Sequence, residues 1–172
     1  FSLVQAEVEN MQSNMQTGGQ RVVVTGAGSG LGRELAVRYA REGARLVLAD
    51  IQDAGLKETL ALVEVAGGKG FCQRCDVRDF SQLAALAQSC DERMGGMAFV
   101  PMLMKQGQGR IINIGSMAAL MQAPGMSNYN VAKAGVVALS ESLMAELHPL
   151  GIKVNVVCPS FFQTNLMDSY RG

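Results

Sequence analysis

Ser116, Tyr129 and Lys133 have the residue types and spacing for proton exchange at an alcohol oxygen. Lys133 follows Tyr129 by four residues, so in a helix the two side chains share one face. An ammonium group beside a phenol favours the phenolate, which lets the tyrosine exchange a proton with a carbinol. Ser116 ends a strand-like run and could hydrogen-bond the same oxygen. Alone, each could be a turn serine, a surface aromatic or a solvated lysine. Together they suit hydride exchange between a carbinol and a nicotinamide, with no metal.

A glycine-rich segment, TGAGSGLG at 25–32, lies between a strand-like apolar run and a helical pattern. A dinucleotide's pyrophosphate binds at such a junction, where a helix amino end offers free N–H groups. Gly26 would permit the sharp turn, and Gly30 would let the backbone approach the phosphates. Gly32 would let the helix pack close to the sheet. A tight turn without a ligand is the alternative.

Asp50 ends the strand-like run that follows the glycine-rich segment and its helix. A carboxylate there can accept hydrogen bonds from an adenosine ribose and repel a 2′-phosphate, which favours NAD over NADP. Arg33 is a contrary sign, because a nearby guanidinium could hold that phosphate. We favour the interpretation of Arg33 as a solvated charge on the helix.

The chain alternates between strand-like and helical segments, with glycines and capping residues at their ends. Asp53 could cap its helix, and Asp79 with Gln82 forms a capping-box pattern. This alternation predicts a single α/β domain over 20–172, a Rossmann-type doubly wound parallel sheet with helices on both faces. The expected strands are 21–25, 44–50, 70–77, 109–116 and 152–160, and the expected helices are 30–43, 54–66, 80–94 and a long one from 127.

Taken together, the motifs resemble the short-chain dehydrogenase/reductase family from about 20 to 166. Five motifs match that family in order: T-G-x-x-x-G-x-G at 25–32, CDV at 75–77, GRIINIGS at 109–116, YNVAK at 129–133 and GIKVNVVCP at 151–159. The spacing from Ser116 to Tyr129 is also the family's usual one. The resemblance implies that Ser116, Tyr129 and Lys133 are catalytic. It implies a cofactor-binding set of Gly26, Ser29, Gly30, Leu31, Gly32, Asp50, Asp76, Val77, Tyr129, Lys133, Pro159, Phe162 and Thr164.

The function expected from this resemblance is NAD(H)-dependent hydride transfer between nicotinamide and a secondary alcohol or ketone. Two alternatives stay open: an NADP(H)-dependent ketoreductase similar to 3-oxoacyl reductases, and a catalytically silent nucleotide-binding protein. The expected partners are a small-molecule alcohol or ketone and further copies of the chain, as a dimer or tetramer.

Composition argues against several other classes of protein. Lys plus Arg equals Asp plus Glu, 15 against 15, so no basic excess points to nucleic acid or an anionic membrane. The longest apolar run, 97–104, is too short to span a membrane, and no secretion leader is recognisable. Cys72 and Cys75 form C-x-x-C without further ligands nearby, which favours unpaired thiols in a reducing cytoplasm.

The sequence also departs from the family pattern. Two elements of the family are absent between Gly96 and Met97. They are the strand that carries an NNAG-type motif and most of the helix after it, which holds the asparagine of the family's proton relay. Typical element lengths put the missing part on the order of 30–45 residues. The family's last strand is absent too, and Ser160 replaces a usual glycine. Residues 1–19 are a tag remnant or unassigned, with 1–11 a candidate short helix.

Two explanations of the internal gap are open. Either the protein contains these residues, and they are missing from the sequence because they were disordered, or the polypeptide itself lacks them. We favour the first, because losing an interior strand orphans backbone groups at about 1–3 kcal/mol each. It predicts more than the usual step of about 3.8 Å between the α-carbons of Gly96 and Met97. It also predicts that the strand at 109–116 lies in the sheet on the first strand's side, with either a vacancy or a foreign segment, for which only residues 1–11 are available, where the family's fourth strand belongs.

Overall fold

The computed structural model describes residues 19–95, 99–122 and 124–160, and the chain divides into two compact units, Phe1–Gly96 and Met97–Gly172. The Gly96–Met97 step and the candidate helix at 1–11 lie outside the described residues. The expected place of the strand at 109–116 beside the first strand stays a prediction. Among the described residues, none of the helices combines the length and apolar character needed to cross a membrane.

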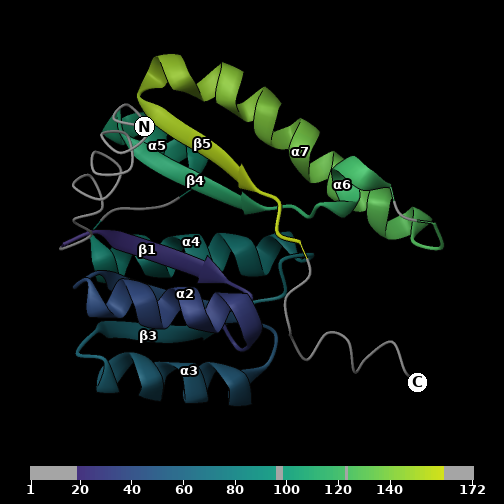
Figure 1. Ribbon diagram of the computed structural model, residues 1–172. Coiled ribbons are helices and arrows are strands. Elements are labelled where there is room, and N and C mark those ends of the chain that lie inside the picture. The colour runs from purple at the N-terminus through teal and green to yellow at the C-terminus, as the bar shows by residue number, and fades with distance from the viewer. Residues whose placement is uncertain (1–18, 96–98, 123, 161–172) are drawn as a thin grey trace, which may run out of the picture. The chain divides into compact units, whose positions relative to one another are not determined.

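The first unit contains a three-stranded parallel sheet in the order β1-β2-β3. Its register pairs Val22 with Leu46 and Leu46 with Gly70. Helices α2 and α3 connect the strands and lie side by side, and α4 follows β3 (Figure 1). The elements are β1 (Arg21–Thr25), α2 (Gly30–Arg41), β2 (Arg45–Asp50), α3 (Asp53–Val65), β3 (Lys69–Arg74) and α4 (Phe80–Met94).

Strand β2 is covered on both of its faces, so its central residues are all buried. Leu46 and Leu48 pack in one cluster with apolar residues of α2 and α3. Val47 points to the opposite face, because side chains alternate along a strand, and it is fully buried as well. Its register partner is Phe71, whose ring lies 3.6 Å beneath the guanidinium of Arg93 in α4. The prediction of helices on both faces is therefore confirmed for this sheet.

The second unit has two parallel strands with three helices among its described residues. Leu103 of α5 and Leu147 of α7 pack with Ile152 and Val154 of β5, and α7 runs along that strand (Figure 1). A short 3-10 turn, His148–Leu150, connects α7 to β5. The elements are α5 (Val100–Gln106), β4 (Gly109–Ile114), α6 (Ala118–Met121), α7 (Ser127–Leu147) and β5 (Ile152–Val157).

The helix caps confirm one prediction and correct another. Asp79 caps α4, since its carboxylate accepts the N–H groups of Ser81 and Gln82. Asp53 is not a cap: α3 begins at Asp53 itself, and Gln52 is the N-cap. The carboxylate of Asp50 accepts the N–H of Gln52 at 3.0 Å, and this turn lets α3 begin one residue earlier than predicted.

Candidate active site

The glycine turn between β1 and α2 has a backbone that only glycines adopt easily. Gly26 has φ +69° and Gly30 φ +50°, values that side chains disfavour. A Cβ on Gly32 would overlap the carbonyl oxygen of Gly26 and lie 2.7 Å from its carbon. Gly32 therefore lets α2 begin close to the backbone that follows β1; its role in helix–sheet packing stays a prediction. Helix α2 begins here with Ser29 as N-cap, whose side chain makes no capping hydrogen bond. The turn fits an anionic group at the helix start.

The carboxylate of Asp50 is oriented by two backbone donors at the end of β2. Its Oδ2 accepts the N–H of Gly28 at 2.9 Å, and its Oδ1 accepts the N–H of Gln52 at 3.0 Å. A Cβ on Gly28 would lie 3.0 Å from the carboxylate carbon. Asp50 and the glycine turn therefore contact each other directly, which joins two of the predicted cofactor-binding features.

Arg33 does not have the solvated position predicted for it. Its side chain is only 25% exposed and forms an ion pair with Glu58 at 2.7 Å. Its Nε also donates to Thr59 Oγ1 at 3.0 Å. Sequence reasoning missed Thr59 and Gly55 as part of this region. The available signal was Gly55 inside a predicted helix, where glycine costs about 1 kcal/mol without a packing reason.

Asp76 and Val77 follow β3, and their side chains differ in environment. Val77 is exposed. The guanidinium of Arg78 hydrogen-bonds the Asp76 carboxylate, and this lowers the pKa of Asp76 to about 2. The Asp76 N–H donates to the side-chain oxygen of Gln82 at 2.9 Å, which connects this segment to the cap of α4.

In the second unit, Lys133 lies close to Tyr129 and to the end of β4. Its Nζ is 5.8 Å from the centre of the Tyr129 ring and donates to the carbonyl oxygen of Ile114 at 3.0 Å. Ser116 lies two residues after Ile114, and its Oγ accepts the N–H of Ala118 at 3.2 Å. The next residue, Met117, donates its N–H to the carbonyl of Pro159 at 2.9 Å.

A polar pair not foreseen from the sequence joins β4 to α7. The side-chain amide of Asn113 donates to Ser140 Oγ at 2.9 Å, and Ser140 is buried. The Ser140 hydroxyl in turn donates to the carbonyl of Val136. Ser140 lies seven residues after Lys133, two helical turns, so both contacts fix α7 along the same strand.

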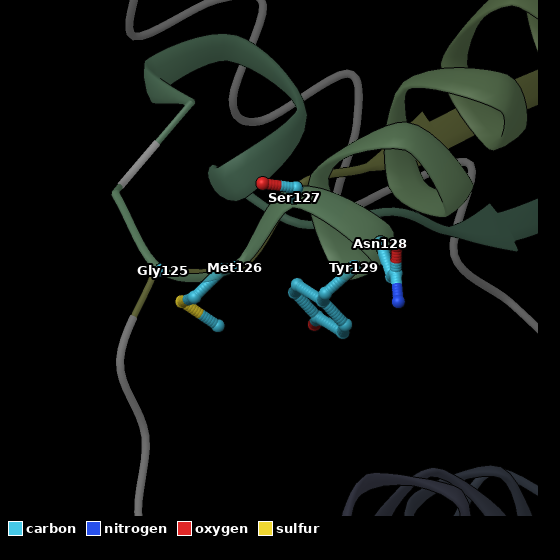
Figure 2. Close-up of a pocket in the computed structure, with 5 residues that line it drawn as sticks. All are labelled: Gly125, Met126, Ser127, Asn128 and Tyr129. Carbon is cyan, nitrogen blue, oxygen red and sulfur yellow. The ribbon is translucent and has the colours of Figure 1, made fainter.

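A hollow of about 400 Å³ opens at the start of α7, lined by Gly125, Met126, Ser127, Asn128 and Tyr129. Figure 2 shows the Tyr129 ring and the Met126 side chain projecting in the same direction, whereas Ser127 points away from them. The side chain of the predicted catalytic tyrosine therefore lines this hollow.

The predicted site residues thus form two described groups. The first unit brings Asp50 to the glycine turn, with Asp76 and Val77 after β3, and the second brings Lys133 to Tyr129 and to the strand before Ser116. Phe162 and Thr164 lie outside the described residues.

A family model described as short chain dehydrogenase matches residues 20–100 and 96–172. This chain belongs to the short-chain dehydrogenase family. A short-chain dehydrogenase/reductase from Burkholderia phymatum, solved in complex with NAD, superposes with a TM-score of 0.84 at 29% identity and covers 91% of this chain and 71% of that one. The fold is therefore a Rossmann-type α/β fold, as predicted.

Two curated relatives are also similar to this chain. "Probable oxidoreductase EphD" of Mycobacterium tuberculosis is 31% identical over 186 residues, with 85% of this chain covered. "Ketoacyl reductase HetN" of a Nostoc species is 29% identical over 182 residues, with 83% of this chain covered. The chain spans only 31% of the length of EphD and 63% of that of HetN.

The alignments bear on the family residues that this chain lacks. The two matched segments of the short-chain dehydrogenase model meet at 96–100. The HetN alignment runs over 182 residues, more than the 172 residues of the whole chain, although it covers only 83% of the chain. The aligned region of the relative therefore includes residues that have no counterpart here.

Proposed function

We propose that the chain is an NAD(H)-dependent oxidoreductase that exchanges hydride between nicotinamide and a secondary alcohol or ketone. The observation that carries the proposal is the position of Lys133, 5.8 Å from the Tyr129 ring and hydrogen-bonded to the end of β4. That position suits a lysine that promotes proton exchange by Tyr129.

Each unit has its own part in this proposal. In the first, the glycine turn and the start of α2 would hold the pyrophosphate of NAD, and Asp50 would hold the adenosine ribose. Asp76 and Val77 would border the adenine, as the family resemblance implies. The bound nicotinamide supplies hydride transfer. The remaining cofactor-binding residues carried over from the family are Ser29, Leu31, Pro159, Phe162 and Thr164.

In the second unit, Tyr129 would give a proton to the substrate oxygen in reduction and take it back in oxidation. Lys133 would stabilise the phenolate and hold the nicotinamide ribose. Ser116 would donate a hydrogen bond to the substrate oxygen and stabilise the charge that develops there. The hollow beside Tyr129 and Met126 is where we place the substrate's carbonyl end.

The preference for NAD over NADP rests on the carboxylate of Asp50, which backbone donors fix at the end of β2. The NAD complex of the Burkholderia phymatum relative supports the same choice. The alternative, an NADP(H)-dependent ketoreductase, is supported by the printed name of HetN, a ketoacyl reductase. A homo-oligomer, dimer or tetramer, is part of the proposal, and the exposed apolar residues Val131, Leu139 and Met144 of α7 support it.

The test is turnover by the intact chain on a panel of secondary alcohols with NAD⁺ and of ketones with NADH, repeated with the NADP pair. We expect nicotinamide oxidation or reduction that depends on substrate and is faster with NAD(H). Faster turnover with NADP(H) would establish the alternative cofactor. Nucleotide binding without turnover on any substrate would support the silent nucleotide-binding protein instead.

A further inference from the structure

Gly28, in the middle of the glycine turn, is held at both of its backbone polar groups by side chains from two other elements. Its N–H donates to the Asp50 carboxylate at 2.9 Å, and its carbonyl accepts a hydrogen bond from the Arg33 guanidinium at 2.5 Å. The first contact comes from the end of β2 and the second from the first turn of α2. One peptide segment of the turn is therefore clamped from both sides.

The same guanidinium connects the turn to α3. Its Nε donates to Thr59, and its terminal nitrogen reaches Glu58 and, at 3.5 Å, the carbonyl oxygen of Gly55. Arg33 therefore contacts one acceptor in the turn and three in α3. A guanidinium has its donors in a fixed planar fork, so these contacts set its orientation.

Helix α3 comes unusually close to the turn. A Cβ on Gly55 would lie 2.5 Å from the carbonyl oxygen of Gly28, so a side chain there would displace the turn. Thr59, fully buried, reaches the carbonyl of Ala27 at 2.8 Å and that of Gly55 at 2.9 Å. Its single hydroxyl hydrogen is shared between these two acceptors, while its oxygen accepts from Arg33.

We propose that Arg33 is a positioning residue that braces the glycine turn against α3, and that it is not a receptor for an adenosine 2′-phosphate. The inference rests on the proposed NAD(H) function and removes the sequence's one argument for NADP. A guanidinium already committed to Thr59, Glu58 and Gly28 would have to leave these partners to bind a phosphate. The carboxylate of Glu58, 2.7 Å from it, would also oppose an incoming anion.

The two roles predict different effects of Arg33→Gln on nucleotide binding. A brace serves any nucleotide that uses the turn, so the dissociation constants of NADH and NADPH should rise by the same factor, about 10-fold or more for lost charge-assisted hydrogen bonds. A phosphate receptor would serve NADPH alone. Arg33→Lys separates the roles again, because lysine can bind a phosphate but cannot form the fork.

The experiment measures both dissociation constants by nucleotide fluorescence for the intact chain, Arg33→Gln, Arg33→Lys and the matched control Arg38→Gln. Arg38 lies on the same helix and forms an exposed ion pair with Glu42. Hydrogen exchange of the amides at 26–32 in the nucleotide-free protein gives a second readout. We expect faster exchange in both Arg33 variants and not in the control. Thr59→Val should show the same pattern if Arg33→Gln folds poorly.

Selective loss of NADPH binding in Arg33→Gln would overturn the proposal, and so would unchanged hydrogen exchange of the turn. Failure of the proposed cofactor preference would appear elsewhere, as tighter binding of NADPH than of NADH by the unsubstituted chain. If that chain binds neither nucleotide, the proposed function fails, and the exchange measurement alone decides whether Arg33 braces the turn.

Discussion

Lys133 donates a hydrogen bond from its Nζ to the carbonyl oxygen of Ile114, at 3.0 Å. Ile114 is the last residue of β4, two positions before Ser116. The contact orders a long, flexible side chain and holds its ammonium near the Tyr129 ring. One helix turn and one strand end thus position the two side chains that we propose for proton exchange.

Lys133→Met keeps the length of the side chain and removes both its charge and its donor. We expect turnover to fall by about 10²-fold or more, the scale of general acid–base catalysis, with weaker NADH binding. Lys153→Met, on the exposed side of β5, is the matched control and should leave both unchanged. Parent-like turnover and NADH affinity in Lys133→Met would exclude the role given to this lysine.

Ser140→Ala removes the buried acceptor of the Asn113 amide. The free energy of unfolding should fall by about 1–3 kcal/mol, since the partly buried Asn113 amide loses its partner. Ser142→Ala removes a hydroxyl that bonds the carbonyl of Ala138 at an exposed position of the same helix, and it should change stability by less than about 0.5 kcal/mol. Denaturant unfolding measures both. Equal effects of the two substitutions would show that the Asn113–Ser140 hydrogen bond adds no more to the free energy of unfolding than the exposed Ser142 hydroxyl does.

Gly32→Ala should distort the glycine turn, because its Cβ would overlap the carbonyl of Gly26. We expect a lower midpoint of thermal unfolding and loss of NADH binding. Gly135 in α7 has open space around it, so Gly135→Ala should be neutral or stabilise by about 0.5–1 kcal/mol. Unimpaired NADH binding by Gly32→Ala would contradict this account of the turn.

Arg78 holds the pKa of Asp76 at about 2, below the ordinary 3.8, mainly through side-chain hydrogen bonding. Because the folded-state pKa is lowered, the stabilisation is present above the ordinary value and is lost as pH falls from there towards 2. Arg78→Gln should raise the pKa of Asp76 towards 3.8 and remove this part of the acid sensitivity. Carboxyl-carbon NMR titration measures it, with Arg74→Gln expected to give a smaller rise. An Asp76 pKa still near 2 in Arg78→Gln would refute the assignment.

Much of the fold could be predicted from local pattern. The strand at 21–25 and the helix at 80–94 have the predicted bounds, because apolar runs, glycine stops and the Asp79 cap act locally. The start of α3 was predicted one residue late, because Asp53 was taken as the cap, whereas Asp50 bonds the N–H of Gln52 two residues on, a local turn contact that competes with that cap.

The candidate site could be predicted where its residues form linear motifs, as Tyr129 and Lys133 do. It could not be predicted where a contact joins distant elements. Arg33 bonds Thr59, 26 residues away, and Asn113 bonds Ser140, 27 residues away. Each of these polar residues also suits a solvated helix or strand surface, so only tertiary packing distinguishes their roles.

Tyr129→Phe tests the central claim most directly, because it removes only the hydroxyl proposed to exchange the proton. The measurement compares turnover of the variant with that of the parent chain at saturating NAD(H), on a substrate that the parent accepts, and records NADH affinity in parallel. We expect unchanged affinity and folding with turnover lower by about 10²-fold or more. Turnover of Tyr129→Phe within a few-fold of the parent would contradict the account.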